Sequence, residues 1–476
     1  MEKIIGRETE KAYLLEILKS PDPELVAVYG RRRVGKTFLI RNSFEKQLLF
    51  EISGIHNASL NQQLENFSEA LSLATGLTIA KLDSWMQAFR MLTDYLTPLV
   101  KRQQKVIFFD EFPWIHTPRS GFLQAFEHFW NTWASRQKNL VVVICGSAAA
   151  WMIQRVINNR GGLHNRVTRR IRLLPFTIAE TAAFLKQRVV SLDFYQILQL
   201  YMVMGGIPQY LKEIQAGESA VQAIDRMCFT KDGLLQSEFK NLFYSLFDKA
   251  DEHIQVIRAL AKNGAGMTRN EIIANCSLKS GGGTTQLLEE LTESGFIVPH
   301  IPFDRTAKDS IFKLSDEYSY FYLKFIENSK FQGAGSWIRF SAGASWKSWS
   351  GFAFERVCMK HIVQLKKALG IAGMHTETSV WRYRPRSGEQ GIQIDLLIDR
   401  GDRCINVCEI KFSISPYEIN KTYAKELEMK IDVLRSETGT RKTLFLTLIT
   451  TFGVKNRKSY PGLIQSEITM DKLFVD

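Results

Sequence analysis

Eight consecutive residues near the N-terminus have the spacing of a phosphate-binding loop. They are Gly30, Arg31, Arg32, Arg33, Val34, Gly35, Lys36 and Thr37. Glycines let backbone N–H groups surround a phosphate, lysine neutralises β- and γ-phosphate oxygens, and the threonine hydroxyl binds Mg²⁺. An apolar run over 24–30 precedes the loop and a helical pattern follows it, as this chemistry requires. The segment therefore predicts a site for ATP and Mg²⁺.

Polar residues also end two further apolar strands. The strand expected over 105–110 ends in Asp110, followed by Glu111. After a phosphate-binding loop, this order predicts that Asp110 serves the Mg²⁺ ion and that Glu111 polarises the attacking water. The strand expected over 139–146 leads to Ser147, which we expect to contact the γ-phosphate. A simple turn of small residues is the alternative explanation for Ser147.

A basic loop follows the third strand. It runs from Arg160 to Arg170, and we expect Arg166 to be a finger that stabilises the charge of the transition state. Such an arginine acting in trans would require a homo-oligomer. For the other arginines of the loop, a solvated surface or one facing nucleic acid is the preferred explanation.

A second group of chemically suggestive residues lies in the C-terminal third. Asp395 and Glu409 are each seven residues from Asp402, the centre of a turn, so an antiparallel hairpin would make them cross-strand neighbours. Lys411 shares a strand face with Glu409. Two carboxylates can hold Mg²⁺ or Mn²⁺, and the lysine can orient water or stabilise the phosphate. A cross-strand salt bridge is the competing explanation.

The elements that position these residues indicate an α/β protein of several parts. Strands alternating with helices predict a parallel sheet covered on both faces. Three helices followed by two strands predict a winged helix, and a segment rich in Gly, Ser and Trp over 331–350 predicts a linker. A helix over 351–369, a strand, a hairpin over 392–412, a helix and a strand then follow. We expect domains over 1–175, 176–250 (a helical lid), 251–328 and 335–476.

Charge is the most informative feature of the composition. The 476 residues carry a net charge of +13. From Gly335 onward, 22 Lys and Arg residues face 15 Asp and Glu residues, which favours a polyanion such as DNA. The stretch Trp381–Arg386 interleaves aromatic and basic residues, as surfaces that contact nucleic-acid strands do, and a solvated edge strand and loop is an equal alternative. Apolar runs are too short to span a membrane, and six scattered cysteines favour a reducing cytoplasm.

Several segments together resemble the archaeal-type ATPase family of the AAA superclass. They are Ile5–Glu8, Tyr29–Thr37, Phe108–Trp114, Cys145–Ser147 and Met204–Pro208. The resemblance implies a P-loop ATPase core with a helical lid over about 1–215. Family members often add a winged helix and a C-terminal domain related to PD-(D/E)XK nucleases. The resemblance to that nuclease core implies that Glu355 lies at its helix position.

These observations predict an ATP-hydrolysing protein coupled to a DNA-binding, metal-dependent, nuclease-like domain. The alternative is a signalling or scaffold ATPase whose C-terminal fold is inert and binds a partner. A transcriptional regulator is disfavoured, because the expected recognition helix Thr284–Ser294 carries three glutamates and neither Lys nor Arg.

Overall fold

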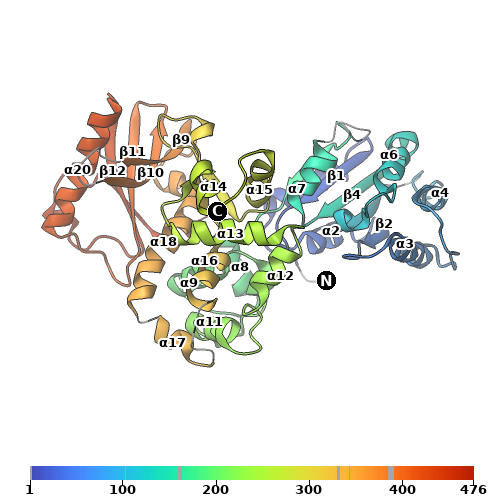
Figure 1. Ribbon diagram of the computed structural model, residues 1–476, viewed down its shortest axis with the longest axis horizontal. Helices are drawn as coiled ribbons and strands as arrows, with labels where there is room; N and C mark the ends of the chain where they lie inside the picture. The colour runs from blue at the N-terminus through green and yellow to red at the C-terminus, as the bar shows by residue number, and fades with distance from the viewer. Residues whose placement is uncertain are drawn as a thin grey trace. The chain divides into compact units, whose positions relative to one another are not determined.

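The computed structural model describes residues 3–101, 103–158, 163, 165–327, 329, 333–341, 343–383 and 391–475. The chain divides into two compact units (Figure 1). The first comprises Met1–Pro175 with Glu289–Gly295, and the second comprises Phe176–Leu288 with Phe296–Asp476. No helix in the described ranges is long and apolar enough to cross a membrane.

The first unit is built on a five-stranded sheet in which every neighbouring pair is parallel. Its spatial order is β2-β3-β4-β1-β5. The strands are β1 (Glu24–Tyr29), β2 (Leu48–Ser53), β3 (Lys105–Asp110), β4 (Leu140–Gly146) and β5 (Arg169–Arg172). This confirms the predicted parallel α/β sheet. The sequence pattern had not indicated β2 and β5, because both lie at sheet edges and carry polar or charged residues.

Helices cover both faces of this sheet. They are α1 (Glu8–Ile17), α2 (Lys36–Phe44), α3 (Leu60–Thr75), α4 (Trp85–Leu96), α5 (Phe112–Ile115), α6 (Phe122–Thr132) and α7 (Ala149–Met152). Ile107 and Phe109 of β3 pack into one core with aromatic residues of α3, α4 and α6. The intervening Val106 and Phe108 are equally buried on the opposite face. Burial of alternate residues on both faces explains the almost continuous apolar sequence of the central strands.

The second unit begins with the helices that the sequence pattern predicts. They are α8 (Ile178–Gln187), α9 (Phe194–Met204), α10 (Pro208–Leu211), α11 (Ala220–Phe229) and α12 (Glu238–Tyr244). Three of them start at a side chain that caps the free backbone N–H groups, namely Thr177, Asp193 and Ser219.

A small helical segment with a three-stranded antiparallel sheet follows. Its elements are α13 (Ala250–Lys262), β6 (Met267–Thr268), α14 (Arg269–Asn275), α15 (Gly282–Glu293), β7 (Ile297–His300) and β8 (Ile311–Leu314). The sheet order is β6-β8-β7. The order of helices and strands matches the one expected for a winged helix. We call β7, β8 and the loop between them the wing hairpin.

The prediction of a linker over 331–350 was wrong. Helices α17 (Ser336–Phe340) and α18 (Ala344–Lys360) occupy most of the described part of this region. Helix α16 (Glu317–Phe321) precedes it, and α19 (Ile362–Ala368) follows α18. Trp337, Trp346 and Trp349 are buried together, with ring centroids 5.0–5.1 Å apart in consecutive pairs. Gly and Ser suggested a break in structure, but burial of three large aromatic side chains outweighs the low helix propensity of their neighbours.

The chain ends in a mixed five-stranded sheet (Figure 1). Its strands are β9 (Thr376–Tyr383), β10 (Ile392–Arg400), β11 (Cys404–Lys411), β12 (Thr443–Thr450) and β13 (Ser466–Thr469), in the order β13-β12-β11-β10-β9. The pairs β9–β10 and β10–β11 are antiparallel, whereas β11–β12 and β12–β13 are parallel. Helix α20 (Lys421–Thr438) covers the face that carries Val407, and α18 packs against β11.

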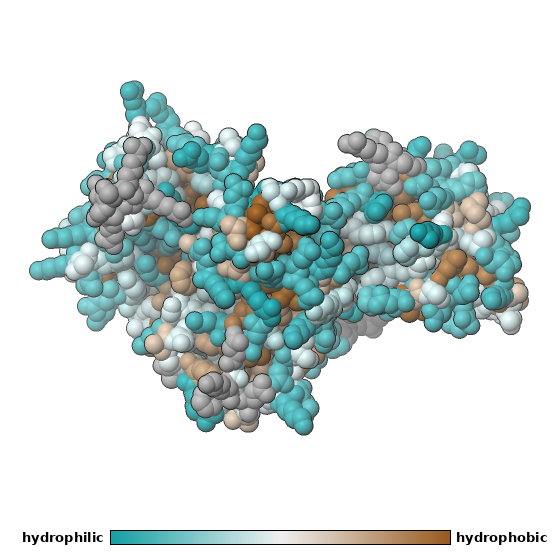
Figure 2. Space-filling model, viewed as in Figure 1, coloured by the Kyte–Doolittle hydropathy of each residue, from teal (hydrophilic) through white to brown (hydrophobic). Residues whose placement is uncertain are grey.

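Side chains on the visible surface are mostly hydrophilic, with small separate apolar patches (Figure 2). Apolar residues such as Leu73 and Ile414 are nevertheless well exposed. Scattered single apolar residues are ordinary on protein surfaces and indicate no binding site by themselves.

Candidate functional site

The predicted phosphate-binding loop connects the end of β1 to the start of α2. Gly30 and Gly35 have φ angles of 144° and 90°, which favour glycine. A Cβ atom at Gly30 would lie 2.2 Å from the carbonyl oxygen of Leu173, so this position has no room for a side chain. The loop therefore turns tightly enough to present backbone N–H groups at the N-terminus of α2.

Lys36 lies inside the curve of this loop. Its buried Nζ donates hydrogen bonds to the carbonyl oxygens of Gly30 at 3.1 Å and Arg31 at 3.0 Å. It donates a third to Oγ of Ser147 at 3.0 Å. The ammonium group is thus held where the loop would surround a phosphate, and the carbonyl bonds keep it oriented.

Two oxygen ligands suited to Mg²⁺ meet beside Lys36. Thr37 Oγ1 donates to Oδ2 of Asp110 at 2.7 Å. The other carboxylate oxygen of Asp110 accepts from the backbone N–H of Glu111 at 3.0 Å. Hydroxyl and carboxylate oxygens are the donors that Mg²⁺ prefers, so this pair fits the predicted ion.

Ser147 joins the lysine to the acidic residue after β3. Its Oγ donates to Oε1 of Glu111 at 2.6 Å, and its N–H donates to Oε2 at 3.1 Å. Glu111 has a positive φ of 43° and immediately precedes α5. Its carboxylate lies toward the end of β4. The sequence pattern had not indicated this contact between Ser147 and Glu111, since it depends on the pairing of β3 with β4.

Residues around the loop support its shape. Arg7, within the N-terminal segment Ile5–Glu8, donates from Nη2 to the carbonyl oxygen of Val34 at 3.3 Å. Arg32 lies over the ring of Trp114, with its guanidinium carbon 5.5 Å from the ring centroid. Arg31 and Val34 are buried, whereas Arg33 is partly exposed. The sequence pattern predicts no role for Arg7, although Arg7 lies in one of the segments that carry the family resemblance.

Arg166 is exposed on the described part of the basic loop. Its backbone N–H donates to the carbonyl oxygen of Leu163 at 3.0 Å. Among the described residues, no hydrogen bond or ion pair joins its side chain to Lys36 or Glu111. Arg160 and His164 lie outside the described residues.

Residues 4–214 match a family model described as an ATPase domain predominantly from Archaea. Residues 4–214, which we call the ATPase domain, are therefore similar to archaeal-type ATPase domains. The same residues include the loop, both strand-end carboxylates and Ser147.

Proteins that match over more of the chain share few identical residues with it. An uncharacterised protein of Methanocaldococcus jannaschii is 22% identical over 424 residues, which are 88% of this chain and 90% of that protein. A Walker-type ATPase of Pyrococcus abyssi is 17% identical with a TM-score of 0.49, covering 68% of this chain and 96% of its own. The ORC2 protein of Aeropyrum pernix, in ADPNP–ADP complexes, is 16% identical with a TM-score of 0.41, covering 67% and 93%.

Beyond the ATPase domain, the hairpin of β10 and β11 brings the predicted C-terminal residues together. Leu396 pairs with Cys408, so Asp395 and Glu409 follow side by side at the end of this ladder. Oδ2 of Asp395 accepts a hydrogen bond from the backbone N–H of Ile410 at 3.0 Å. A bulge in β10, between Ile394 and Leu397, lies at the position of Asp395.

Glu409 is paired with two lysines. It is 1% exposed, and its Oε1 lies 2.8 Å from Nζ of Lys430 on α20. Nζ of Lys411 lies 3.6 Å from Oε2, which also accepts from the hydroxyl of Tyr423 at 3.4 Å. The sequence offered a signal for Lys430, because it continues the helical spacing of the buried Ala424 and Leu427.

The carboxyl group of Asp395 has a perturbed pKa. Burial, with the nearby negative charges of Glu409 and Glu355, raises its pKa to about 7. Glu355 of α18 lies 2.8 Å from Nζ of Lys313 on β8. The structure thus brings Glu355, Asp395, Glu409 and Lys411 into one charged group, which we call the carboxylate site.

The fit of this site to a metal ion is partial. Asp395 and Glu409 offer oxygen ligands, and a cation would relieve the charge repulsion that, after burial, raises the pKa of Asp395. Within the described ranges, no three or more His, Cys, Asp or Glu side chains are arranged to hold a metal ion. Any ion would therefore need ligands beyond these two carboxylates.

Other polar groups of the second unit gain no role. Cys408 is buried, Cys404 on the same strand is only partly buried, and both are free thiols. Burial lowers the pKa of His300 to about 4. Trp381 stacks on Tyr383 at 6.4 Å, while Arg384 and Arg386 lie outside the described residues.

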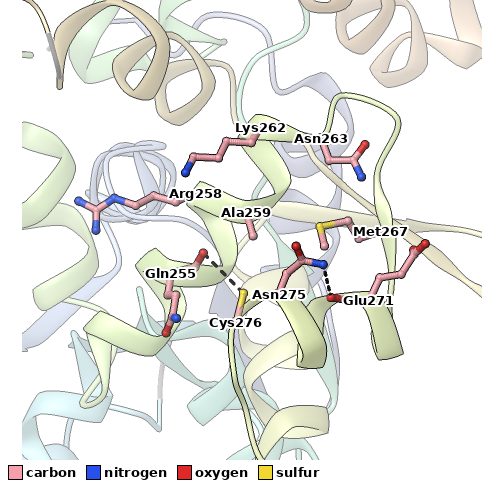
Figure 3. Close-up of a pocket in the computed structure, with 9 residues that line it drawn as sticks. All are labelled: Gln255, Arg258, Ala259, Lys262, Asn263, Met267, Glu271, Asn275 and Cys276. Carbon is pink, nitrogen blue, oxygen red and sulfur yellow. Dashed lines mark hydrogen bonds between the residues drawn. The ribbon is translucent and has the colours of Figure 1, made fainter.

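A cavity of about 440 Å³ lies between α13 and α14 (Figure 3). Its lining includes Arg258, Lys262, Asn275 and Cys276. Arg258 is already paired with Glu327 at 2.5 Å, and Asn275 donates to the backbone of its own helix. None of the residues predicted to do chemistry lines this cavity.

Proposed function

We propose that the ATPase domain binds Mg²⁺-ATP at Gly30–Thr37 and hydrolyses it. The observation that carries this proposal is the continuous set of contacts from Lys36 through Ser147 to Glu111, beside the Thr37–Asp110 pair. These groups come from the ends of three neighbouring parallel strands, where α/β sheets bind their ligands.

Each side chain would have a distinct part in the reaction. Lys36 and the loop N–H groups would neutralise phosphate oxygens, and Thr37 with Asp110 would hold the Mg²⁺ ion, which supplies positive charge to the phosphates when bound. Glu111 would accept a hydrogen bond from the attacking water and orient it in line with the γ-phosphate. Ser147 would hold the Glu111 carboxylate through the two hydrogen bonds described above.

Two substitutions separate binding from turnover. We expect Lys36→Ala to abolish ATP binding, measured by calorimetry or with a fluorescent analogue. Glu111→Gln should retain binding and reduce turnover by about 100-fold or more, because the neutral amide is a poor acceptor for the water proton. Equal ATP affinity of wild type and Lys36→Ala would contradict this assignment of the loop.

We also propose that the C-terminal domain engages DNA and that the carboxylate site is a metal-dependent, nuclease-like centre. The raised pKa of Asp395, typical of functional carboxylates, and the excess of basic residues beyond Gly335 support it. The test is cleavage of plasmid DNA with Mg²⁺ or Mn²⁺, with and without ATP. Asp395→Asn should abolish cleavage and leave ATP hydrolysis unchanged.

A specific observation favours the alternative of an inert C-terminal fold that binds a partner. Glu409 and Glu355 already have lysine partners, so their charges are balanced without a metal ion. Titration of the full chain with Mn²⁺ distinguishes the two functions. Binding that Asp395→Asn removes supports the nuclease-like centre, whereas equally weak binding by both proteins supports the inert fold.

A further inference from the structure

The wing hairpin is attached to the C-terminal part of the second unit. Pro302 forms a parallel bridge with Val380 of β9, and the N–H of Phe303 donates to the carbonyl oxygen of Val380 at 3.1 Å. The Phe303 ring packs against the core beneath α20. On β8, the carbonyl oxygen of Leu314 accepts from Nε of Arg356 at 2.7 Å. The hairpin is therefore fixed at both its loop and its second strand.

This attachment brings a lysine into the carboxylate site. Lys313 lies on β8 and is 8% exposed, and its partner Glu355 is 9% exposed. The 2.8 Å contact between them is an ion pair largely removed from water. A buried ammonium group is costly without its partner, so the pair holds the wing hairpin and α18 together.

The lysines that pair with the carboxylates of the site belong to different elements of the chain. Lys411 and Lys430, which pair with Glu409, belong to β11 and α20 and stay with the sheet. Lys313 belongs to the wing hairpin, a separate element of the chain. Helix α18, which carries Glu355, packs against β11, which carries Glu409, so the charge balance at Glu355 acts on the neighbouring carboxylates.

We propose that Lys313 is an internal counter-ion that keeps the affinity of the carboxylate site for divalent cations low while the wing hairpin is attached. Its ammonium group pairs with the carboxylate of Glu355, and its positive charge repels a divalent cation that approaches the site. Detachment of the hairpin would remove that charge and raise the affinity for the cation. This inference rests on the proposed metal-binding role of the site, and it makes the wing hairpin its regulator.

Mn²⁺ titration calorimetry on the full chain tests the proposal. We expect Lys313→Met to bind Mn²⁺ about tenfold more tightly than wild type, the change that an interaction equal to one pKa unit would give. Lys308→Met is the matched control, because Lys308 is an exposed lysine on the same hairpin, and it should bind as wild type does.

A double variant shows whether a change in Mn²⁺ affinity arises from misfolding. Lys313→Met leaves Glu355 buried without its partner, whereas Lys313→Met with Glu355→Gln removes both charges and should unfold at a temperature close to that of wild type. In the Glu355→Gln background, adding Lys313→Met should raise the affinity for Mn²⁺. This increase should be smaller than the one that Lys313→Met causes in wild type.

The outcomes separate the two proposals. If Asp395→Asn loses Mn²⁺ binding but Lys313→Met binds as wild type does, the role of Lys313 is wrong and the metal site stands. If none of the proteins binds Mn²⁺, including Lys313→Met, the proposed metal site is wrong and the regulation falls with it.

Discussion

Ser147 joins two side chains of the proposed ATP site through one hydroxyl. It accepts from Lys36 and donates to Glu111, so the charge that would face the γ-phosphate and the carboxylate that would orient water share one anchor. The sequence suggested only that a polar residue ends β4. Its connecting position becomes visible only when β3 and β4 lie side by side.

Loss of this hydroxyl should affect turnover more than binding. In Ser147→Ala, Lys36 keeps its two carbonyl partners, while Glu111 keeps only the backbone N–H donor. We expect kcat to fall about tenfold or more, with less than a threefold change in KM for ATP, because orientation of the water is lost rather than phosphate binding. Steady-state ATPase assays check this, with Ser436→Ala on the exposed face of α20 as control. A change confined to KM would contradict the role given to Ser147.

The raised pKa of Asp395 predicts a pH-dependent cost to stability. A carboxyl with a pKa of about 7 in the folded protein and about 4 when unfolded binds more protons in the folded state between these values. Its contribution to stability is therefore complete below about pH 4 and is lost as the pH rises through 7. Relative to wild type, Asp395→Asn should become more stable from pH 5 to pH 8.

Thermal unfolding at several pH values measures this difference between wild type and Asp395→Asn. Adding Mn²⁺ should reduce it, because a bound cation stabilises the ionised carboxylate of wild type. A difference in unfolding temperature that is the same at every pH would show that Asp395 ionises normally.

At the scale of elements, helices α17 and α18 connect the helical segment at the start of the second unit to its C-terminal sheet. Asp225 of α11 accepts hydrogen bonds from the N–H groups of Gly335 and Trp337 at 2.6 and 2.7 Å. The Trp337 ring stacks on Phe229 at 5.7 Å. These contacts explain why a segment rich in Gly and Ser is folded.

Trp337 should therefore be a major contributor to the stability of the second unit. We expect Trp337→Ala to lower the free energy of unfolding by about 3–5 kcal/mol, because it removes a fully buried ring and leaves a cavity. The adjacent Ile338 is 54% exposed, so Ile338→Ala should cost no more than about 0.5 kcal/mol. Urea unfolding followed by tryptophan fluorescence and circular dichroism provides the comparison. Equal effects of the two substitutions would mean that α17 is not anchored by its tryptophan.

At the scale of the whole molecule, we propose that the ATPase domain works in a homo-oligomer. Arg166 is exposed and its side chain makes no described contact with the catalytic residues of its own chain, so a neighbouring chain is the natural recipient of its charge. The net charge of +13 would also favour assembly along a polyanion such as DNA.

A finger acting in trans makes the ATPase rate depend on protein concentration. The rate per chain should rise with concentration for wild type, and Arg166→Ala should remove that rise without weakening ATP binding. Arg136→Ala, at another exposed arginine of the same unit, should behave as wild type. A wild-type rate per chain that is constant across concentrations, in a protein confirmed as monomeric, would contradict action in trans.

The sequence by itself determined the features that depend on neighbouring residues. The phosphate-binding loop is contiguous, so its identity could be predicted from Gly30 to Thr37. The pairing of Asp395 with Glu409 followed from their equal distances to one turn. By contrast, tertiary structure decided the partners of these groups, because Ser147 meets Glu111, Lys313 meets Glu355 and Lys430 meets Glu409 across separations of 36, 42 and 21 residues. Such contacts arise from strand pairing and helix packing, which no local spacing encodes.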